Sequence, residues 1–291
     1  MQEEKAGCLI DLHCGNNLPG TPADPNAYGR VQPALQFMHL FPYIDSLWFG
    51  EGYDYDQPPE YWLVEVSGLA FGLMGDMMHA GNPWRGMLYG MTTRFRCADP
   101  QPIWRVWDAF QIDKAVMIGF WEADEKRPVT LGCAAATTTA NTTLDDGAVL
   151  ATSYVRRGDA TLVAIASWAN TTASCRLHVD YAALGLEARS VRLTRPHIEG
   201  FQDAHVHAHA HAADPAVGSH SVDIDAGRGF LLLLEHNATR TLGAAYETEA
   251  SATALVARDL AALRAALVPS PRGRGGATEM AMRTKIPQSM R

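Results

Sequence analysis

The carboxylate with the clearest catalytic potential is Glu51, which lies between Gly50 and Gly52 directly after an aromatic segment at 47–49. The two glycines let backbone and substrate approach closely. Aromatic neighbours lower the local dielectric, and this raises a carboxyl pKa toward the range that a general acid needs. The alternative is a loop carboxylate that makes only turn hydrogen bonds. Glu51 is therefore the first candidate for a catalytic role.

A second polar cluster starts at Asp11, after the apolar run 8–10, and continues through His13 and Asn16. An aspartate at a strand end can act as a nucleophile, as a base or as a group that binds hydroxyls. The alternative for Asp11 is an Asx turn before Gly15. Both interpretations stay open from the residues alone.

Aromatic and acidic side chains alternate between residues 48 and 89. The aromatic ones are Trp48, Phe49, Tyr53, Tyr55, Tyr61, Trp62, Trp84 and Tyr89, and the acids that follow Glu51 are Asp54, Asp56 and Glu60. Sugar rings have apolar faces and hydroxyl edges, so aromatic platforms beside carboxylates suit carbohydrate. Most of these aromatic side chains are expected in the core, with two or three lining a pocket. Arg85 could pair with a site carboxylate or with a structural one.

Four histidines, His205, His207, His209 and His211, alternate with small residues. On a strand they would share one face and could bind a metal ion. The simple composition around them favours a solvated loop instead. No other metal site is predicted, because the acidic stretch 54–60 lacks the spacing of a calcium-binding EF-hand.

Composition and motifs exclude several classes of protein. The net charge of −8 argues against nucleic-acid binding through phosphates. No run of about 18 apolar residues predicts a membrane span, and the first residues lack the pattern of a signal peptide. Phosphate-binding, nucleotide-cofactor and zinc-protease motifs are absent, so no cofactor is expected. The five scattered cysteines, without a C-x-x-C pair, favour buried free thiols.

The first part of the chain alternates strand-like and helix-like segments. Helices are expected at 33–40, 60–66 and 102–110, and strands at 8–12, 43–49 and 85–91. This alternation predicts a parallel sheet covered by helices. In such sheets, sites form just beyond the carboxyl ends of the strands, and Asp11, His13, Glu51 and Asp54 are expected there.

The composition changes near residue 122. Residues 122–147 are polar and simple in composition, which indicates a linker or insertion. Five short strands are expected beyond it, at 149–155, 161–168, 175–179, 190–193 and 229–234, with a hairpin turn at 157–159 and one capped helical turn at 180–185. These strands predict an antiparallel β-sandwich.

Several segments resemble glycoside hydrolase family 123-like proteins. They are Ile10-Asp11-Leu12-His13-Cys14-Gly15-Asn16-Asn17, Pro42 to Tyr53, Tyr61 to Gly68, Phe71 to Met77, Asn82 to Met87, Ile165 to Trp168, Ile198 to Gln202 and Gly229 to Leu233. The resemblance covers roughly residues 8–235, and it is to the C-terminal half of those proteins. It implies the last units of a TIM-type barrel and a trailing β-sandwich, with any leader or upstream half outside this chain.

The resemblance also implies a reaction. Family 123 enzymes use an adjacent Asp-Glu pair, in which the N-acetyl group of the substrate attacks and the glutamate is the acid/base. That pair would lie upstream of this chain, because the Asp124-Glu125 pair lies in the expected linker. In the more usual two-carboxylate scheme, Asp11 and Glu51 would be the pair, at a separation of about 5–5.5 Å for retention or about 6.5–9.5 Å for inversion.

The sequence thus predicts an α/β plus all-β protein. Its expected parts are a partial TIM-type (β/α) barrel at 1–121, a linker or insertion at 122–147, a β-sandwich at 148–236, a helical extension at 237–268 and a disordered tail at 269–291. The predicted function is glycoside-hydrolase-like action on the glycosidic bonds of a complex glycan, and the possibility that the chain is an inactive fragment stays open. The expected catalytic residues are Glu51 and Asp11, and the expected substrate-binding residues are His13, Asn16, Trp48, Tyr53, Asp54, Trp84 and Arg85.

The alternatives are a non-catalytic carbohydrate-binding protein, or a metal-binding or structural protein built around His205, His207, His209 and His211. The compartment stays open, with an extracellular location possible for a longer form.

Overall fold

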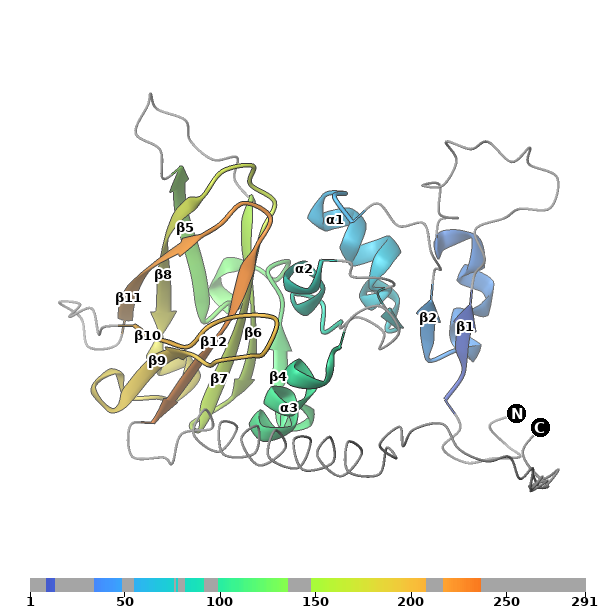
Figure 1. Ribbon diagram of the computed structural model, residues 1–291. Helices are drawn as coiled ribbons and strands as arrows, with labels where there is room; N and C mark the ends of the chain where they lie inside the picture. Colours follow the sequence, from blue (N-terminus) through green and yellow to red (C-terminus); the bar gives the residue numbers. More distant parts are fainter. Residues whose placement is uncertain are drawn as a thin grey trace, which may run out of the picture. The chain divides into compact units, whose positions relative to one another are not determined.

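The structure, a computed structural model, describes residues 9–13, 34–48, 55–75, 77, 82–91, 99–135, 148–207 and 217–236. The chain divides into two compact units, Met1–Glu247 and Thr248–Arg291, and every described residue belongs to the first. The predicted helical extension and tail at 237–291 lie outside the described residues. The described part consists mostly of antiparallel sheets with few helices (Figure 1). None of its helices is long and apolar enough to cross a membrane.

Three short parallel strands form the first sheet. They are β1 (Asp11–His13), β2 (Ser46–Trp48) and β3 (Met74–Gly75), in the order β1-β2-β3. A 3₁₀ helix over Ala34–Tyr43 precedes β2, in the region where the sequence predicts a helix at 33–40. The side chain of Asp45 fixes the entry to the sheet, because its Oδ2 accepts a hydrogen bond from the Ile10 backbone N at 2.7 Å.

The helices that follow are short. They comprise α1 (Pro59–Tyr61), which continues as a π-helical turn over Trp62–Val66, a 3₁₀ turn at Leu69–Phe71, α2 (Pro83–Met87) and α3 (Gln101–Phe110). The predicted helices at 60–66 and 102–110 are confirmed. The predicted strand at 85–91 is wrong, because α2 occupies its first half. Asn82 caps this helix by accepting a hydrogen bond from the Arg85 N at 3.0 Å, and Pro83 suits its first position.

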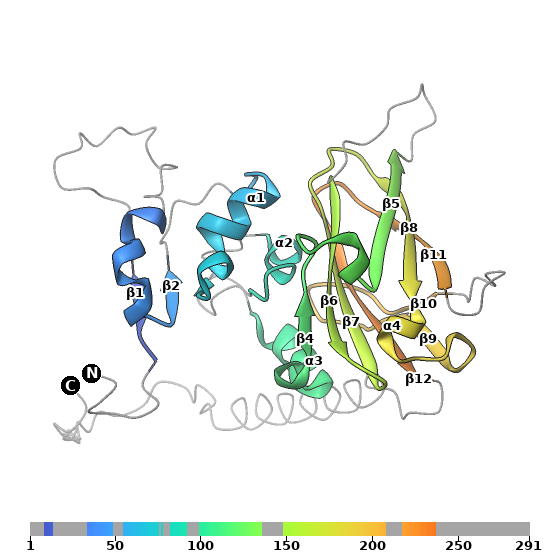
Figure 2. The same ribbon diagram turned by 180° about the vertical axis from the view of Figure 1, so that it is seen from behind.

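Among the described residues, nine strands build two antiparallel sheets. They are β4 (Val116–Ile118), β5 (Val129–Ala135), β6 (Val149–Arg156), β7 (Ala160–Ser167), β8 (Ala173–Asp180), β9 (Val191–Arg195), β10 (His205–His207), β11 (Val217–Ile224) and β12 (Gly229–His236). The larger sheet has the order β10-β9-β12-β7-β6-β4, and the smaller one has the order β11-β8-β5. Figure 2 shows the same two layers from behind. The five predicted strands are confirmed as β6, β7, β8, β9 and β12.

Small elements link these strands. Single 3₁₀ turns occur at Ile112–Lys114, Asp124–Lys126 and Ala188–Ser190. The predicted hairpin turn joins β6 to β7, with Gly158 at a φ of 75° that favours glycine. The predicted capped turn is α4 (Tyr181–Leu184), in which Asp180 Oδ1 accepts from the Ala183 N and Gly185 ends the helix at a φ of 70°.

Strand β7 explains how the interior is organised, because all its residues are buried. Val163 and Ile165 face a core shared with β8 and β11 of the smaller sheet. Leu162, Ala164 and Ala166 belong to a second core, which includes helical residues such as Trp62. A central strand with both faces covered reads as a continuous apolar run, as the sequence does here.

Two predictions fail at β5. The interpretation of 122–147 as a linker or insertion does not hold for Val129–Ala135, which pairs with β8 along its whole length. The expectation of free thiols is wrong for Cys133 and Cys175, which form a disulfide between these neighbouring strands. Residues 42 positions apart come together because β5 and β8 pair in antiparallel register, and the spacing of the cysteines alone does not reveal that.

Candidate functional site

The predicted site residues fall into two groups. Asn16, Glu51, Tyr53 and Asp54 lie outside the described residues, as do His209 and His211. The backbone is described for His13 and Trp48, and the side chains are described for Asp11, Trp84 and Arg85. The structure therefore shows the side-chain contacts of Asp11, Trp84 and Arg85, and the role of Glu51 stays a prediction.

The register of β1 and β2 distinguishes the two ends of the parallel sheet. Asp11 pairs with Ser46 where both strands begin, and His13 pairs with Trp48 where both end. The prediction that Asp11 follows the end of a strand is wrong, since it is the first residue of β1. Pairing starts there because the backbone of Ile10 is bonded to Asp45. Sites in parallel (β/α) folds form at the carboxyl ends of strands, so the register favours the end with His13 and Trp48.

The Asp11 carboxylate already has a hydrogen-bond partner. Its Oδ1 accepts from the Ser46 Oγ at 2.8 Å, and the side chain is exposed. This bond ties the amino ends of two parallel strands together. A structural role therefore accounts for the contact that the structure shows.

Arg85 is buried, with 5% of its surface exposed. Its Nε donates to the Ser167 carbonyl at 3.3 Å, and its Nη1 donates to the Tyr55 carbonyl at 2.5 Å. Nη1 also pairs with the exposed Asp56 carboxylate at 2.9 Å, and the guanidinium lies 4.7 Å from the centroid of the Trp168 ring. The predicted carboxylate partner thus exists, but two backbone carbonyls share the guanidinium with it.

The segment 55–57 is held by a second side chain. Trp168 donates from its Nε1 to the Gln57 carbonyl at 2.8 Å. This segment, which follows Asp54 in the sequence, is therefore fixed onto the larger antiparallel sheet. Asn82, at the start of α2, separately donates from Nδ2 to the Gly227 carbonyl at 3.0 Å and so links α2 to the turn before β12. Sequence reasoning missed the role of Trp168. The feature that could have indicated it is an indole N–H donor directly after a buried apolar strand.

Trp84 was expected to present a face to a sugar, but two groups contact its ring. Phe201 stacks on it with ring centroids 5.4 Å apart, and the Arg228 guanidinium lies 4.9 Å from its centroid. The side chain is half-buried. These contacts account for Trp84 as a packing residue at the edge of the second core.

Other aromatic residues of this stretch that the structure describes belong to that core. Trp62 stacks on Tyr89 at 5.7 Å, and Tyr89 stacks on Trp121 at 5.9 Å. Tyr89 donates from its hydroxyl to the Pro59 carbonyl at 2.8 Å. Burial raises the pKa of its phenol far above the usual range. The expectation that most of these rings pack in the core agrees with these contacts.

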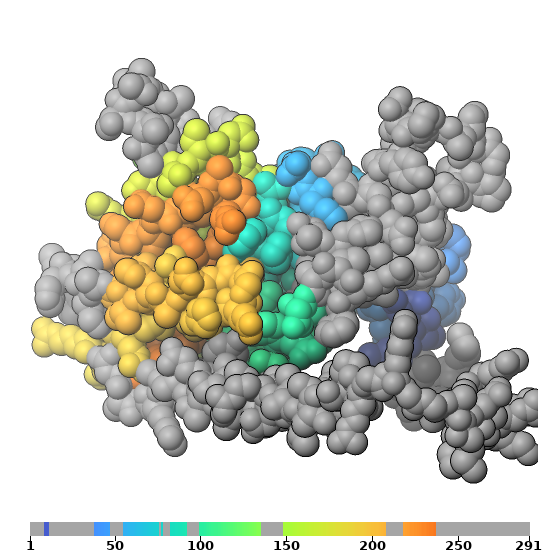
Figure 3. All heavy atoms as spheres, in the orientation of Figure 1, coloured from blue at the N-terminus to red at the C-terminus, as the bar shows by residue number. Residues whose placement is uncertain are grey.

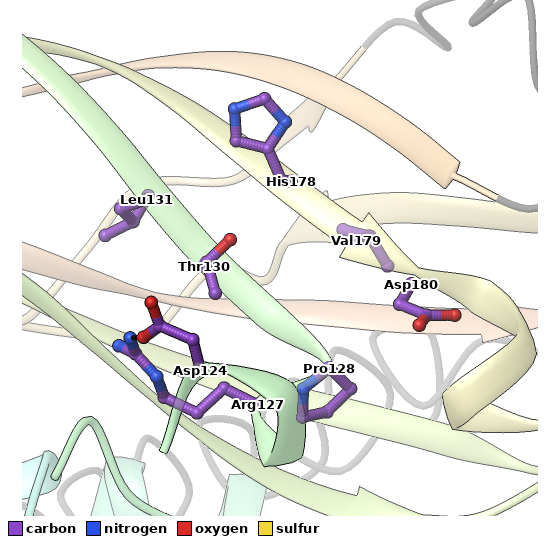
Figure 4. Close-up of a pocket in the computed structure, with 8 residues that line it drawn as sticks. All are labelled: Asp124, Arg127, Pro128, Thr130, Leu131, His178, Val179 and Asp180. Atoms are coloured by element: carbon purple, nitrogen blue, oxygen red, sulfur yellow. Dashed lines mark hydrogen bonds and ion pairs between the residues drawn. The ribbon is translucent and has the colours of Figure 1, made fainter. Parts of the chain in front are cut away.

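A surface hollow of about 490 Å³ lies where β5 and β8 meet the turn at 124–126 (Figure 4). Its lining residues are Asp124, Arg127, Pro128, Thr130, Leu131, His178, Val179 and Asp180. Asp124 and Arg127 form an ion pair, and His178 lies opposite Thr130 on the neighbouring strand. Sequence reasoning missed this hollow, although every second residue of β8 is exposed. Its lining contains no Phe, Tyr or Trp side chain, and so lacks the large apolar ring on which a sugar stacks.

Two of the four alternating histidines are described. His205 and His207 lie on β10, so the prediction of a solvated loop is wrong for this part. Burial lowers the pKa of His207 to about 4, and His205, Arg195 and His220 add to the effect. Within the described residues, no group of three or more His, Cys, Asp or Glu side chains could hold a metal ion.

Two family models match consecutive parts of the chain. The chain matches the glycoside hydrolase 123 TIM-barrel domain over residues 1–96 and the glycoside hydrolase 123 C-terminal domain over residues 99–235. Neither a curated protein nor a solved structure matches the chain. Both matched domains are domains of glycoside hydrolases. The chain belongs to the glycoside hydrolase family 123-like proteins, so the resemblance in the sequence is confirmed.

Proposed function

We propose that this chain contributes to the hydrolysis of glycosidic bonds in a complex glycan. The observation that carries the proposal is the register of β1 and β2. It brings the backbones of His13 and Trp48 together at the carboxyl ends of parallel strands, inside the region that matches the barrel domain. Catalytic groups of (β/α) barrels come from these ends and from the loops that follow them.

The proposed roles follow from this polarity. Glu51 is the general acid/base, because it comes three residues after the end of β2, between two glycines. His13, Asn16, Trp48, Tyr53 and Asp54 bind the sugar. Asp11 is the weaker candidate for a second carboxylate, since its hydrogen bond to Ser46 lies at the opposite end of the strands.

The finer architecture is part of the same proposal. The parallel strands β1–β3 would belong to a partial (β/α) barrel, and the two antiparallel sheets would form the trailing β-sandwich. The shared apolar core between the sheets supports the second assignment. The core that joins Trp62 to Leu162 supports a close association of the helical segments with the larger sheet.

The test is a matched pair of carboxylate-to-amide variants, Glu51→Gln and Asp11→Asn, in the untagged full chain. Release of 4-nitrophenol from aryl N-acetylhexosaminides and from the corresponding hexosides would be measured. We expect Glu51→Gln to lower kcat by about 10²–10⁴, the usual contribution of a general acid. Asp11→Asn is expected to change kcat by less than about tenfold, through stability alone.

The outcomes separate the rival functions. Unchanged kcat in Glu51→Gln would remove this residue from the mechanism. A larger loss in Asp11→Asn than in Glu51→Gln would reverse the assignment. A chain that cleaves no glycoside but binds sugars on a glycan array would instead be a carbohydrate-binding relative. Preference for N-acetylhexosaminides would support the assistance by the substrate's N-acetyl group that the family implies.

A further inference from the structure

The alternating histidines of β10 are not used by the proposed function. His205 and His207 are two positions apart on a strand, so their side chains share one face. The centroids of their imidazole rings are 4.6 Å apart, and the ring planes meet at 78°. β10 is one of the two outermost strands of the larger sheet, and Figure 3 shows the gold part of the chain, which includes β10, at the surface beside the orange part.

His207 carries a polar atom that needs an explanation. Its Nε2 is shielded from solvent and has no hydrogen-bond partner. Buried polar atoms in proteins nearly always have a partner, and an exception points to an unseen water or ion, a strained contact or a functional role. A metal ion bound at this nitrogen would be such a partner.

We propose that His205 and His207 together chelate one divalent transition-metal ion of the Zn²⁺, Ni²⁺ or Cu²⁺ class. Imidazole suits these metals, and the nitrogens of such ligands lie about 2.0–2.1 Å from the ion. Two rings that bind one ion must lie within a few ångströms of each other, as these two do. The exposed position of His205 leaves the remaining coordination positions to water or to a small anion.

Charged and polar neighbours of His205 and His207 influence how tightly the two side chains bind a metal ion. Arg195 lies opposite His205 on β9, donates to the Asp203 carbonyl at 2.9 Å and packs over the Phe230 ring. Its positive charge opposes a bound cation, so Arg195→Gln is expected to tighten metal binding. His220 from β11 also faces His207, but its Nε2 is already within 3.0 Å of the Tyr181 hydroxyl. The pair therefore acts as a two-histidine chelate.

The experiment titrates NiCl₂ and ZnCl₂ separately into the full chain, purified without a polyhistidine tag, and follows the heat of binding. The variants are His205→Gln, His207→Gln and the double variant His209→Gln/His211→Gln. We expect one ion per chain for the unaltered protein. Either variant on β10 should weaken binding about tenfold or more, and the double variant should leave the affinity within about twofold.

Thermal unfolding without metal separates loss of binding from loss of fold. His205 is exposed, so His205→Gln keeps the test valid if His207→Gln unfolds the strand. Binding that survives both β10 variants would mean an adventitious ion only. Binding lost in the double variant, or equally in all variants, would assign the metal to the repeat at 205–211 as a whole. Each of these results would overturn the chelate on β10.

Discussion

The antiparallel sheets and the parallel sheet of this chain differ in how they bury apolar surface. Strands β6, β7, β8, β11 and β12 have eight residues each, whereas β1 and β2 have three each and β3 has two. Four of the seven large apolar side chains exposed in the described part belong to the region of the parallel sheet. They are Leu9 (79% exposed), Met38 (51%), Tyr43 (70%) and Met74 (61%).

The two regions therefore differ in how much of their own apolar surface they cover. The antiparallel sheets cover one another's apolar faces, and β7 is buried on both sides. A parallel sheet is stable when helices and further strands cover it. The exposed side chains around β1–β3 are therefore apolar surface that the described elements leave uncovered.

The largest effect is expected in the core between the two antiparallel sheets. Leu177 on β8 is fully buried, so Leu177→Ala should lower the free energy of unfolding by about 2–5 kcal/mol. Leu9→Ala is the matched control, because the same truncation at a residue that is 79% exposed removes little burial. Urea unfolding followed by circular dichroism would measure both. Equal losses in the two variants would break the contrast between the regions.

The disulfide should be the next largest contribution to the antiparallel sheets. Cys133–Cys175 links residues 42 positions apart, and its loss should cost about 2–4 kcal/mol. The measurement is the melting temperature with and without reductant. The double variant Cys133→Val/Cys175→Val is the control, since its melting temperature should not respond to reductant. An unaltered chain that is equally insensitive would show that the sheets do not depend on this bond.

Sequence patterns predicted the antiparallel strands well because the information is local. Alternation along β8 and the continuous apolar run of β7 follow directly from which faces are covered. The cap at Asp180 and the turn at Gly158 depend only on nearby backbone atoms. Such features need no knowledge of the rest of the fold.

The failures came from contacts between distant residues. The position of Asp11 depends on Asp45, and the fate of Cys133 depends on a strand 42 positions away. The neighbours of Arg85 in the sequence favour a site residue. Its partners Ser167 and Trp168, however, lie more than 80 residues further along the chain. The composition of 85–91 favours a strand, although Asn82-Pro83 signals a helix start.

The third prediction tests the boundary between the compared regions. Arg85→Met should destabilise the chain by about 1.5–3 kcal/mol, because the carbonyls of Tyr55 and Ser167 lose a charged donor. Asp56→Asn is the control. Asp56 is 91% exposed at its side chain, and exposed ion pairs contribute about 0–1 kcal/mol.

Hydrogen exchange adds local information to that measurement. Arg85→Met should raise the exchange of amides in 55–57, while the amides of β8 stay protected. A stability unchanged by Arg85→Met would mean that 55–57 is not held by the larger sheet. Residues 55–57 would then belong with the region of the parallel sheet, and the boundary between the two regions would lie between residues 57 and 82.

The smallest effect concerns a buried phenol that links the helical segments to the larger sheet. Tyr154 on β6 is 4% exposed and donates to the Met87 carbonyl at 2.6 Å. Tyr154→Phe should cost about 0.5–1.5 kcal/mol at pH 7 through this hydrogen bond. Tyr43→Phe, at a residue that is 70% exposed, is the neutral-pH control.

The same variant has a pH signature with a defined sign. Burial raises the pKa of the Tyr154 phenol, so the folded chain keeps its proton where the unfolded chain loses it. Stability from this group is complete below about pH 10 and is lost as the pH rises further. Tyr154→Phe should therefore flatten the alkaline loss of stability, measured by urea unfolding between about pH 9 and 11. A slope identical to that of the unaltered chain would mean that Tyr154 ionises within the fold, and that its contact with Met87 does not join the two regions tightly.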